Sequence, residues 1–186
     1  MPAPPSIVRM NLAELLVATV LVGLMLGSLL TGLEQGHRVY ATGNARVEMT
    51  QNARVALARM ATEIRQAGRG PRTDVFPAIA VAEPSRIVLQ HDINGDGIIA
   101  GIGETITWRL AGSVLRRDAG GGAQPIINGV TGLTFAYLDV GGQAAASLAA
   151  IRTVTISLTT APTHTASVLA AASAHTVTTQ VRLRNR

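Results

Sequence analysis

The chain has 186 residues, a formal net charge of +5 and no cysteine. The length suits one globular domain besides any membrane anchor, and the lack of cysteine excludes disulfides and thiolate chemistry. All 16 basic residues are arginine, and a charge of +5 permits weak attraction to anionic surfaces without specifying a partner.

An apolar stretch near the start dominates the chain. Residues 1–9 are proline-rich and predict a short leader, whereas residues 15–33 carry no charge over 19 positions. That length gives about 28 Å of helix, enough to cross the hydrocarbon core of a bilayer. A secretory signal peptide is less favoured, because the apolar run is too long and lacks a clean cleavage site. A plain membrane anchor explains the run but not Glu14, a carboxylate at its head.

Residues 10–18, Met-Asn-Leu-Ala-Glu-Leu-Leu-Val-Ala, resemble the mature start of type IV pilins and type II secretion pseudopilins. Leu12 and Glu14 stand at the leucine and glutamate of that motif, and Met10 stands at its N-methylated first residue. Two positions depart from it: Asn11 replaces the usual threonine, and Arg9 replaces the glycine that prepilin peptidase expects. Two origins of the mature end therefore stay open, cleavage between Arg9 and Met10 or translation from Met10.

The resemblance implies partners and a location. The partners would be other pilins or pseudopilins in a filament, an inner-membrane assembly platform and prepilin peptidase. Glu14 would neutralise the free amine of Met10 in a neighbouring subunit, because an unpaired charge is costly in an apolar helix bundle. The chain would span the bacterial inner membrane once and later enter a pilus or pseudopilus. Arg9 and the amino terminus form the short positive flank, which favours a cytoplasmic start and a periplasmic or other extracytoplasmic domain.

A second periodic stretch follows the apolar run. Apolar residues recur every three or four positions up to Ile64, and Gly68 is expected to end the helix. We therefore expect one helix over residues 10–68, with a possible bend at Gly36 and Gly43 and Asn44 able to cap its second part. Residues 49–68 also resemble the helix of PilW-type minor pilins and GspJ-type pseudopilins. The solvent-exposed face of this helix is expected to hold Arg46, Glu48, Arg54, Arg59, Glu63 and Arg65.

Alternating patterns in residues 69–186 predict an antiparallel β-sheet domain. In the clearest pattern Ile106, Trp108 and Leu110 share one strand face. A helix followed by antiparallel strands gives an α+β fold, here pilin-like, with the helix packed on the sheet. Residues 73–84 read as a linker, and the expected strands cover residues 87–90, 104–110, 113–117, 133–138, 151–160 and 176–183.

One loop has the spacing of a metal site. Oxygen-bearing side chains alternate before Gly97, as in the first half of an EF-hand calcium loop. The second half departs from that pattern, since Gly103 occupies the twelfth position and Glu104 comes one residue late. The alternative is a polar turn built from Asn-Gly and Asp-Gly, which needs no ion. The calcium hypothesis names as ligands Asp92, Asn94, Asp96, Ile98 (through its carbonyl) and Glu104.

No pattern predicts catalysis, and no cofactor other than calcium is expected. His91 and Asp92 are adjacent and would point to opposite strand faces, and the sequence has neither a nucleophile elbow nor a phosphate loop. Arg182 and Arg184 form a basic cluster whose default interpretation is a solvated strand end. Contact with DNA phosphates is the alternative. The sequence thus favours a minor pilin or pseudopilin over a membrane-anchored binding domain or a DNA-binding minor pilin of a competence system.

Overall fold

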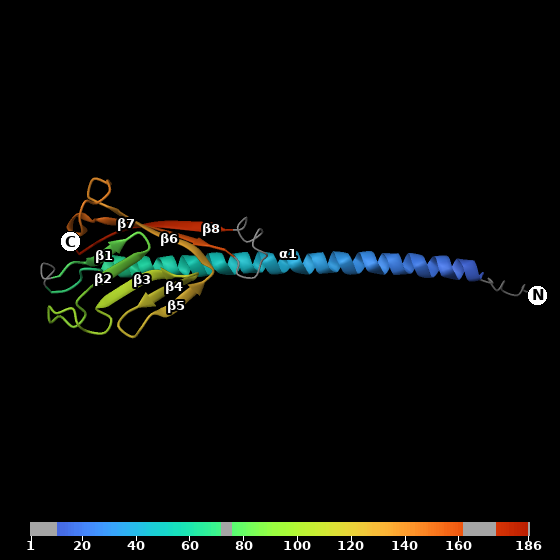
Figure 1. The fold of residues 1–186 in the computed structure, drawn as a ribbon, viewed down its shortest axis with the longest axis horizontal. Helices are drawn as coiled ribbons and strands as arrows, with labels where there is room; N and C mark the ends of the chain where they lie inside the picture. The colour runs from blue at the N-terminus through green and yellow to red at the C-terminus, as the bar shows by residue number, and fades with distance from the viewer. Residues whose placement is uncertain (1–10, 72–75, 162–173, 186) are drawn as a thin grey trace, which may run out of the picture. The chain divides into compact units, whose positions relative to one another are not determined.

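The computed structural model describes residues 11–71, 76–161 and 174–185 (Figure 1). The chain divides into two compact units, Met1–Asn44 and Ala45–Arg186, and one helix, α1 (Leu12–Gln66), supplies residues to both. The expected α+β class is confirmed, because this long helix precedes strands that all pair antiparallel.

The first unit consists of the apolar half of α1. The large apolar side chains of this half are exposed, and the helix is long and apolar enough to span a membrane. Three hydroxyl groups of the apolar stretch donate to backbone carbonyls one turn earlier: Thr19 to Leu15 (2.7 Å), Ser28 to Met25 (2.8 Å) and Thr31 to Gly27 (2.8 Å). Such bonds satisfy polar groups without water and suit a helix in lipid.

The helix runs without interruption through Gly36, Gly43 and Asn44, so the expected cap at Asn44 is wrong. Each glycine costs a helix only about 1 kcal/mol, which the surrounding helix-forming residues outweigh. The predicted end at Gly68 is confirmed. Gly68 has φ of +76°, in the left-handed region that glycine tolerates, and its N–H donates to the carbonyl of Gln90 at 2.8 Å.

The second unit holds two sheets where the sequence suggested one. The chain changes sheet at Gly129, whose φ of +74° turns it sharply between the fifth and sixth strands. The first sheet has the order β1 (Ile79–Glu83), β2 (Arg86–Gln90), β3 (Thr105–Ala111), β4 (Val114–Asp118) and β5 (Gln124–Asn128). The second has the order β6 (Val130–Leu138), β7 (Thr153–Thr160) and β8 (His175–Arg182), and a short 3-10 turn, η1 (Leu148–Ala150), precedes β7.

The six predicted strands are present with small shifts at their ends, but β1 and β5 were missed. Prolines explain both omissions. Pro77 and Pro84 flank β1 and made its segment resemble a linker, and Pro125 lies within β5. Proline is tolerated in β5 because this is an edge strand, and the backbone N–H groups on its outer side have no neighbouring strand to bond.

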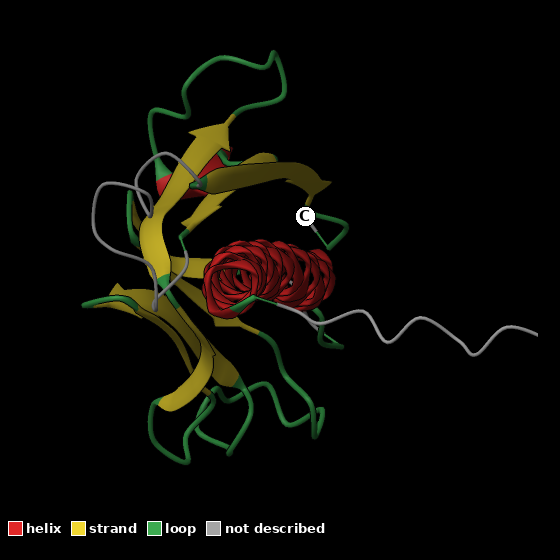
Figure 2. Cartoon of the chain, turned by 90° about the vertical axis from the view of Figure 1, so that its right-hand side faces the viewer, coloured by secondary structure: helices red, strands yellow, loops and turns green. Residues whose placement is uncertain are grey.

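Both sheets pack on one face of the second half of α1. Figure 2 looks along the helix and shows the strands of this unit fanned around it. The predicted face of β3 is confirmed, since Ile106 and Trp108 are buried and Leu110 packs against the same core. The buried helix face combines small alanines, which let the sheets approach closely, with larger apolar side chains that fill the core: Ala53, Ala56, Leu57, Met60, Ala61 and Ile64.

Candidate functional site

Glu14 lies in the first turn of α1. Asn11 precedes the helix, and its N–H donates to Oε2 of Glu14 at 3.3 Å, which is half of a capping box. A negative charge also suits this end of the helix, where backbone N–H groups lack partners. The local structure thus gives Glu14 one role within its own chain, as a helix cap.

The surroundings of Glu14 suggest a second role. Among the described residues Glu14 forms no ion pair, and the apolar stretch that follows holds no basic side chain. The apolar side chains of this half of the helix are open, with Leu12 77% and Met25 73% exposed. A contiguous apolar surface of this kind requires lipid or protein to cover it. The helix therefore presents one carboxylate at the end of an apolar surface, a combination suited to a cationic partner.

The structure places only part of the predicted assembly motif. Leu12 and Glu14 occupy the start of α1, whereas the predicted processing positions Arg9 and Met10 lie outside the described residues.

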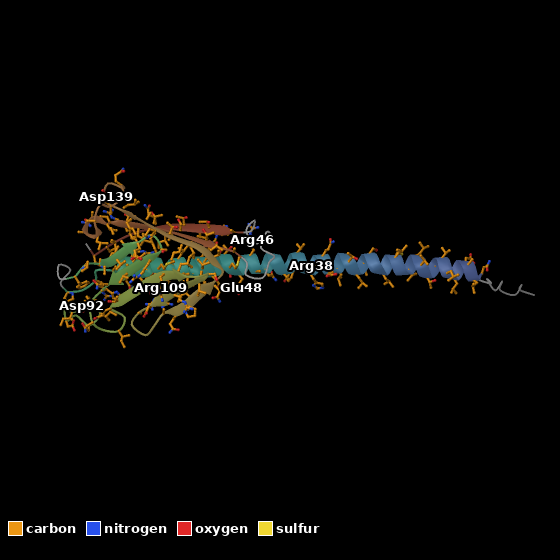
Figure 3. The ribbon with its side chains drawn as sticks, viewed as in Figure 1. Arg38, Arg46, Glu48, Asp92, Arg109 and Asp139 are labelled. Atoms are coloured by element: carbon orange, nitrogen blue, oxygen red, sulfur yellow. The ribbon has the colours of Figure 1, made fainter. Side chains whose placement is uncertain are left out.

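The predicted calcium loop is a compact turn held by two buried carboxylates. Asp92 is 4% exposed, and its two oxygens accept the N–H groups of Gly95 (2.6 Å) and Gly97 (2.9 Å). Asp96 accepts from the N–H of Ile98 (2.7 Å) and from the side-chain amide of Asn94 (2.8 Å). Figure 3 shows Asp92 at the loop end of the domain.

Glu104 closes the same loop from its other end. It is 1% exposed, and its oxygens accept the N–H groups of Gly101 (2.6 Å), Ala100 (3.1 Å) and Ile93 (3.3 Å). Several N–H donors around one carboxylate offset the cost of burying its charge. This role for Glu104 explains a buried acid at this position without a cation.

The predicted ligands thus share one loop but point their oxygens at its backbone. In the described part of the chain, no group of three or more acidic, histidine or cysteine side chains is arranged to hold a metal ion. The hydrogen bonds of Asp92 and Glu104 are those of a self-contained polar turn, and calcium binding stays a prediction.

Sequence reasoning missed a buried polar cluster between α1 and the first sheet. Glu63 was expected on the solvent-exposed face of the helix, but it is only 9% exposed, so that expectation is wrong. Its carboxylate accepts the indole N–H of Trp108 (2.6 Å) and the Nε–H of Arg117 (2.8 Å), and Arg59 lies 3.4 Å away. The helix pattern alone does not reveal these partners, because they lie 45 and 54 residues further along the chain.

His91 lies near this cluster. It is 9% exposed, and its Nδ1 has no hydrogen-bond partner within the described residues. Burial lowers the pKa of His91 below its usual 6.5. The carboxylates of Glu63 and Glu104 oppose that shift, and the positive charges of Arg117 and Arg69 add to it.

The two predicted DNA contacts, Arg182 and Arg184, do lie together. They line one pocket with Arg65 of α1 and Arg152, two arginines that the sequence did not connect with them.

Comparison of the sequence with models of known protein families and with curated proteins finds no match.

Proposed function

We propose that this protein is a minor pilin or pseudopilin, a subunit that assembles into a type IV pilus or type II secretion pseudopilus through its N-terminal helix. Its work would be assembly rather than catalysis. The observation that carries the proposal is Glu14, a carboxylate that lies in the first turn of an exposed apolar helix and has no ion pair among the described residues. The resemblance of residues 10–18 to the mature start of that family supports the same conclusion.

Physical chemistry connects this observation to assembly. The apolar half of α1 would be stored in the bilayer as a single span, with the domain of residues 45–186 outside the cytoplasm. On assembly the helix would move from lipid into a bundle of related helices. A charged side chain in an apolar environment costs roughly 3 kcal/mol near the middle of a span, and a positive partner reduces that cost. The free amine at Met10 of an adjacent subunit would be that partner and would set the axial register.

The decisive experiment separates the charge of Glu14 from its capping role. Glu14→Gln keeps an oxygen for the N–H of Asn11, since glutamine also serves in a capping box, but removes the charge. We expect about tenfold less of this variant in filaments sheared from cells, with normal levels in the membrane. Glu34→Gln is the matched control, because Glu34 is an exposed acid of the same helix that pairs with Arg38. Incorporation of Glu14→Gln at the wild-type level would contradict the proposal and leave a membrane-anchored binding domain.

A further inference from the structure

A pocket of about 520 Å³ lies in the second unit, between the last turn of α1 and the end of β8. Among the described residues that line it, none is acidic. Its polar lining comes from one glutamine and four arginines: Arg65, Arg152, Gln180, Arg182 and Arg184. Val140 is among its apolar lining residues.

The pocket is built by contacts between segments far apart in the sequence. The N–H of Leu183 donates to the carbonyl of Arg152 at 2.9 Å, which places the strand end beside the start of β7. The side-chain amide of Asn185 donates to the carbonyls of Gln66 and Ala67, both at 3.3 Å, and joins the same segment to the end of α1. These bonds bring the four arginines around one volume.

Arg65, Arg182 and Arg184 are exposed, so solvation accounts for each of them singly, but pairing with acids or helix ends does not account for their grouping. Arg65 in the last turn suits the negative end of α1, but Asn185 already donates to the carbonyls there. Arg152 donates to the carbonyls of Ala149 (2.9 Å) and Ile151 (3.1 Å) and keeps its positive charge uncompensated. Within the described ranges none of the four has a salt bridge, whereas Arg117 pairs with Glu63 and other arginines also pair with acids. Four like charges around one pocket repel each other, and an anion would relieve that repulsion.

We infer that this pocket binds a phosphate group. A guanidinium presents a planar fork of donors that matches phosphate oxygens. One carboxylate has two oxygens and one charge, which is too little for four arginines, whereas a phosphate monoester brings three oxygens and nearly two charges.

The pocket fits a compact anion better than a nucleic-acid strand. None of its lining residues is aromatic, so the bases of a single strand would find no stacking surface. The phosphate could belong to a soluble monoester or to the monoester head group of phosphatidic acid, and the chemistry of recognition is the same. This inference does not depend on the proposed assembly function.

Calorimetry on the full chain in neutral detergent tests the inference. Inorganic phosphate and short-chain phosphatidic acid would be titrated at constant ionic strength, set with sodium chloride. The test variant is R182Q/R184Q. The control is Arg109→Gln, which removes one positive charge at an exposed arginine of β3 outside the pocket (Figure 3), and R182Q alone matches it charge for charge. We expect affinity for phosphate to fall at least tenfold in R182Q/R184Q and to stay unchanged in Arg109→Gln.

The second variant, R182K/R184K, keeps the charges but loses the forked donors, and we expect an intermediate loss. Tighter binding of phosphatidic acid than of phosphate would identify a lipid head group, and the reverse would identify a soluble phosphate; both support the inference. Four results would overturn it: no binding of either probe by the wild type, an equal loss in Arg109→Gln, equal binding of citrate, or tighter binding of a duplex oligonucleotide that R182Q/R184Q abolishes.

Discussion

The indole N–H of Trp108 donates to the carboxylate of Glu63 at 2.6 Å and thereby ties β3 to α1 inside the core. Trp108 is fully buried, and the same carboxylate holds Arg117 of β4 at 2.8 Å. One acid on the helix thus satisfies two donors on two neighbouring strands. Because polar groups in a core must be paired, this contact specifies which helix face meets the first sheet.

Glu63→Ala should destabilise the domain strongly. The change leaves the Trp108 donor and the Arg117 charge without a partner in a mostly buried place, and we expect a loss of about 3 kcal/mol in the free energy of unfolding. Trp108 is the single tryptophan of the chain, so its fluorescence reports unfolding in urea directly.

Two further variants serve as comparisons. Glu63→Gln offers only one acceptor oxygen and should lose less unfolding free energy than Glu63→Ala. Glu48→Ala, on an exposed position of the same helix (Figure 3), should change the free energy by less than about 0.5 kcal/mol. A loss below 1 kcal/mol for Glu63→Ala would show that the contact adds little.

Acidification should weaken the domain through His91. Burial lowers the pKa of His91 in the folded protein, while in the unfolded chain the imidazole titrates near 6.5. Below that pH the unfolded state binds more protons than the folded state, so stability falls as the pH drops from 7.5 towards 5.5. Glu63 and Glu104 reduce the effect, and Arg117 and Arg69 increase it.

The measurement is the melting temperature of the wild type and of His91→Gln at both pH values. His91→Gln cannot titrate at this position, so its melting temperature should differ less between the two pH values than that of the wild type. His37→Gln, at an exposed position of α1, should behave as the wild type does. If His91→Gln keeps the full pH dependence, another group is responsible.

The acidic loop offers a test of the calcium prediction. Glu104→Gln replaces one acceptor oxygen by an amide that cannot accept the N–H groups of Ala100 and Gly101, and should cost about 1–3 kcal/mol without any calcium present. If the loop binds calcium, the wild type should gain melting temperature in calcium chloride but not in magnesium chloride, and Asp92→Asn should remove the gain. Equal melting temperatures in both salts would contradict calcium binding and leave the polar turn.

The end of α1 should tolerate no side chain at Gly68. A Cβ there would lie 2.7 Å from the carbonyl oxygen of Asn185 and 2.9 Å from Cβ of Ala78, and φ is already +76°. We expect Gly68→Ala to lower the free energy of unfolding by about 3 kcal/mol, more than the 1–2 kcal/mol of left-handed strain alone. Gly112→Ala isolates that strain, because Gly112 has φ of +62° and no atom within 4 Å of its Cβ position. If Gly68→Ala and Gly112→Ala lose the same free energy of unfolding in urea, the close approach of Asn185 contributes nothing.

Local patterns were sufficient to predict the helix, its end at Gly68 and the buried face of β3 around Trp108. Apolar spacing and the conformational freedom of glycine are properties of short segments, and they need no knowledge of distant contacts. The same is true of the Glu14 position at the head of an apolar run. Proline misled the prediction at β1 and β5, because its effect depends on whether a strand lies at an edge, which only the sheet order decides.

The sequence by itself determined an α+β chain whose long apolar helix carries one carboxylate at its start, since composition and periodicity act along the chain. Only the tertiary structure decided that Glu63 is buried against Trp108 and Arg117, and that Arg65 and Arg152 join Arg182 and Arg184 around one pocket. These groupings join residues dozens of positions apart. They arise from how two sheets close on one helix, and no local spacing encodes that.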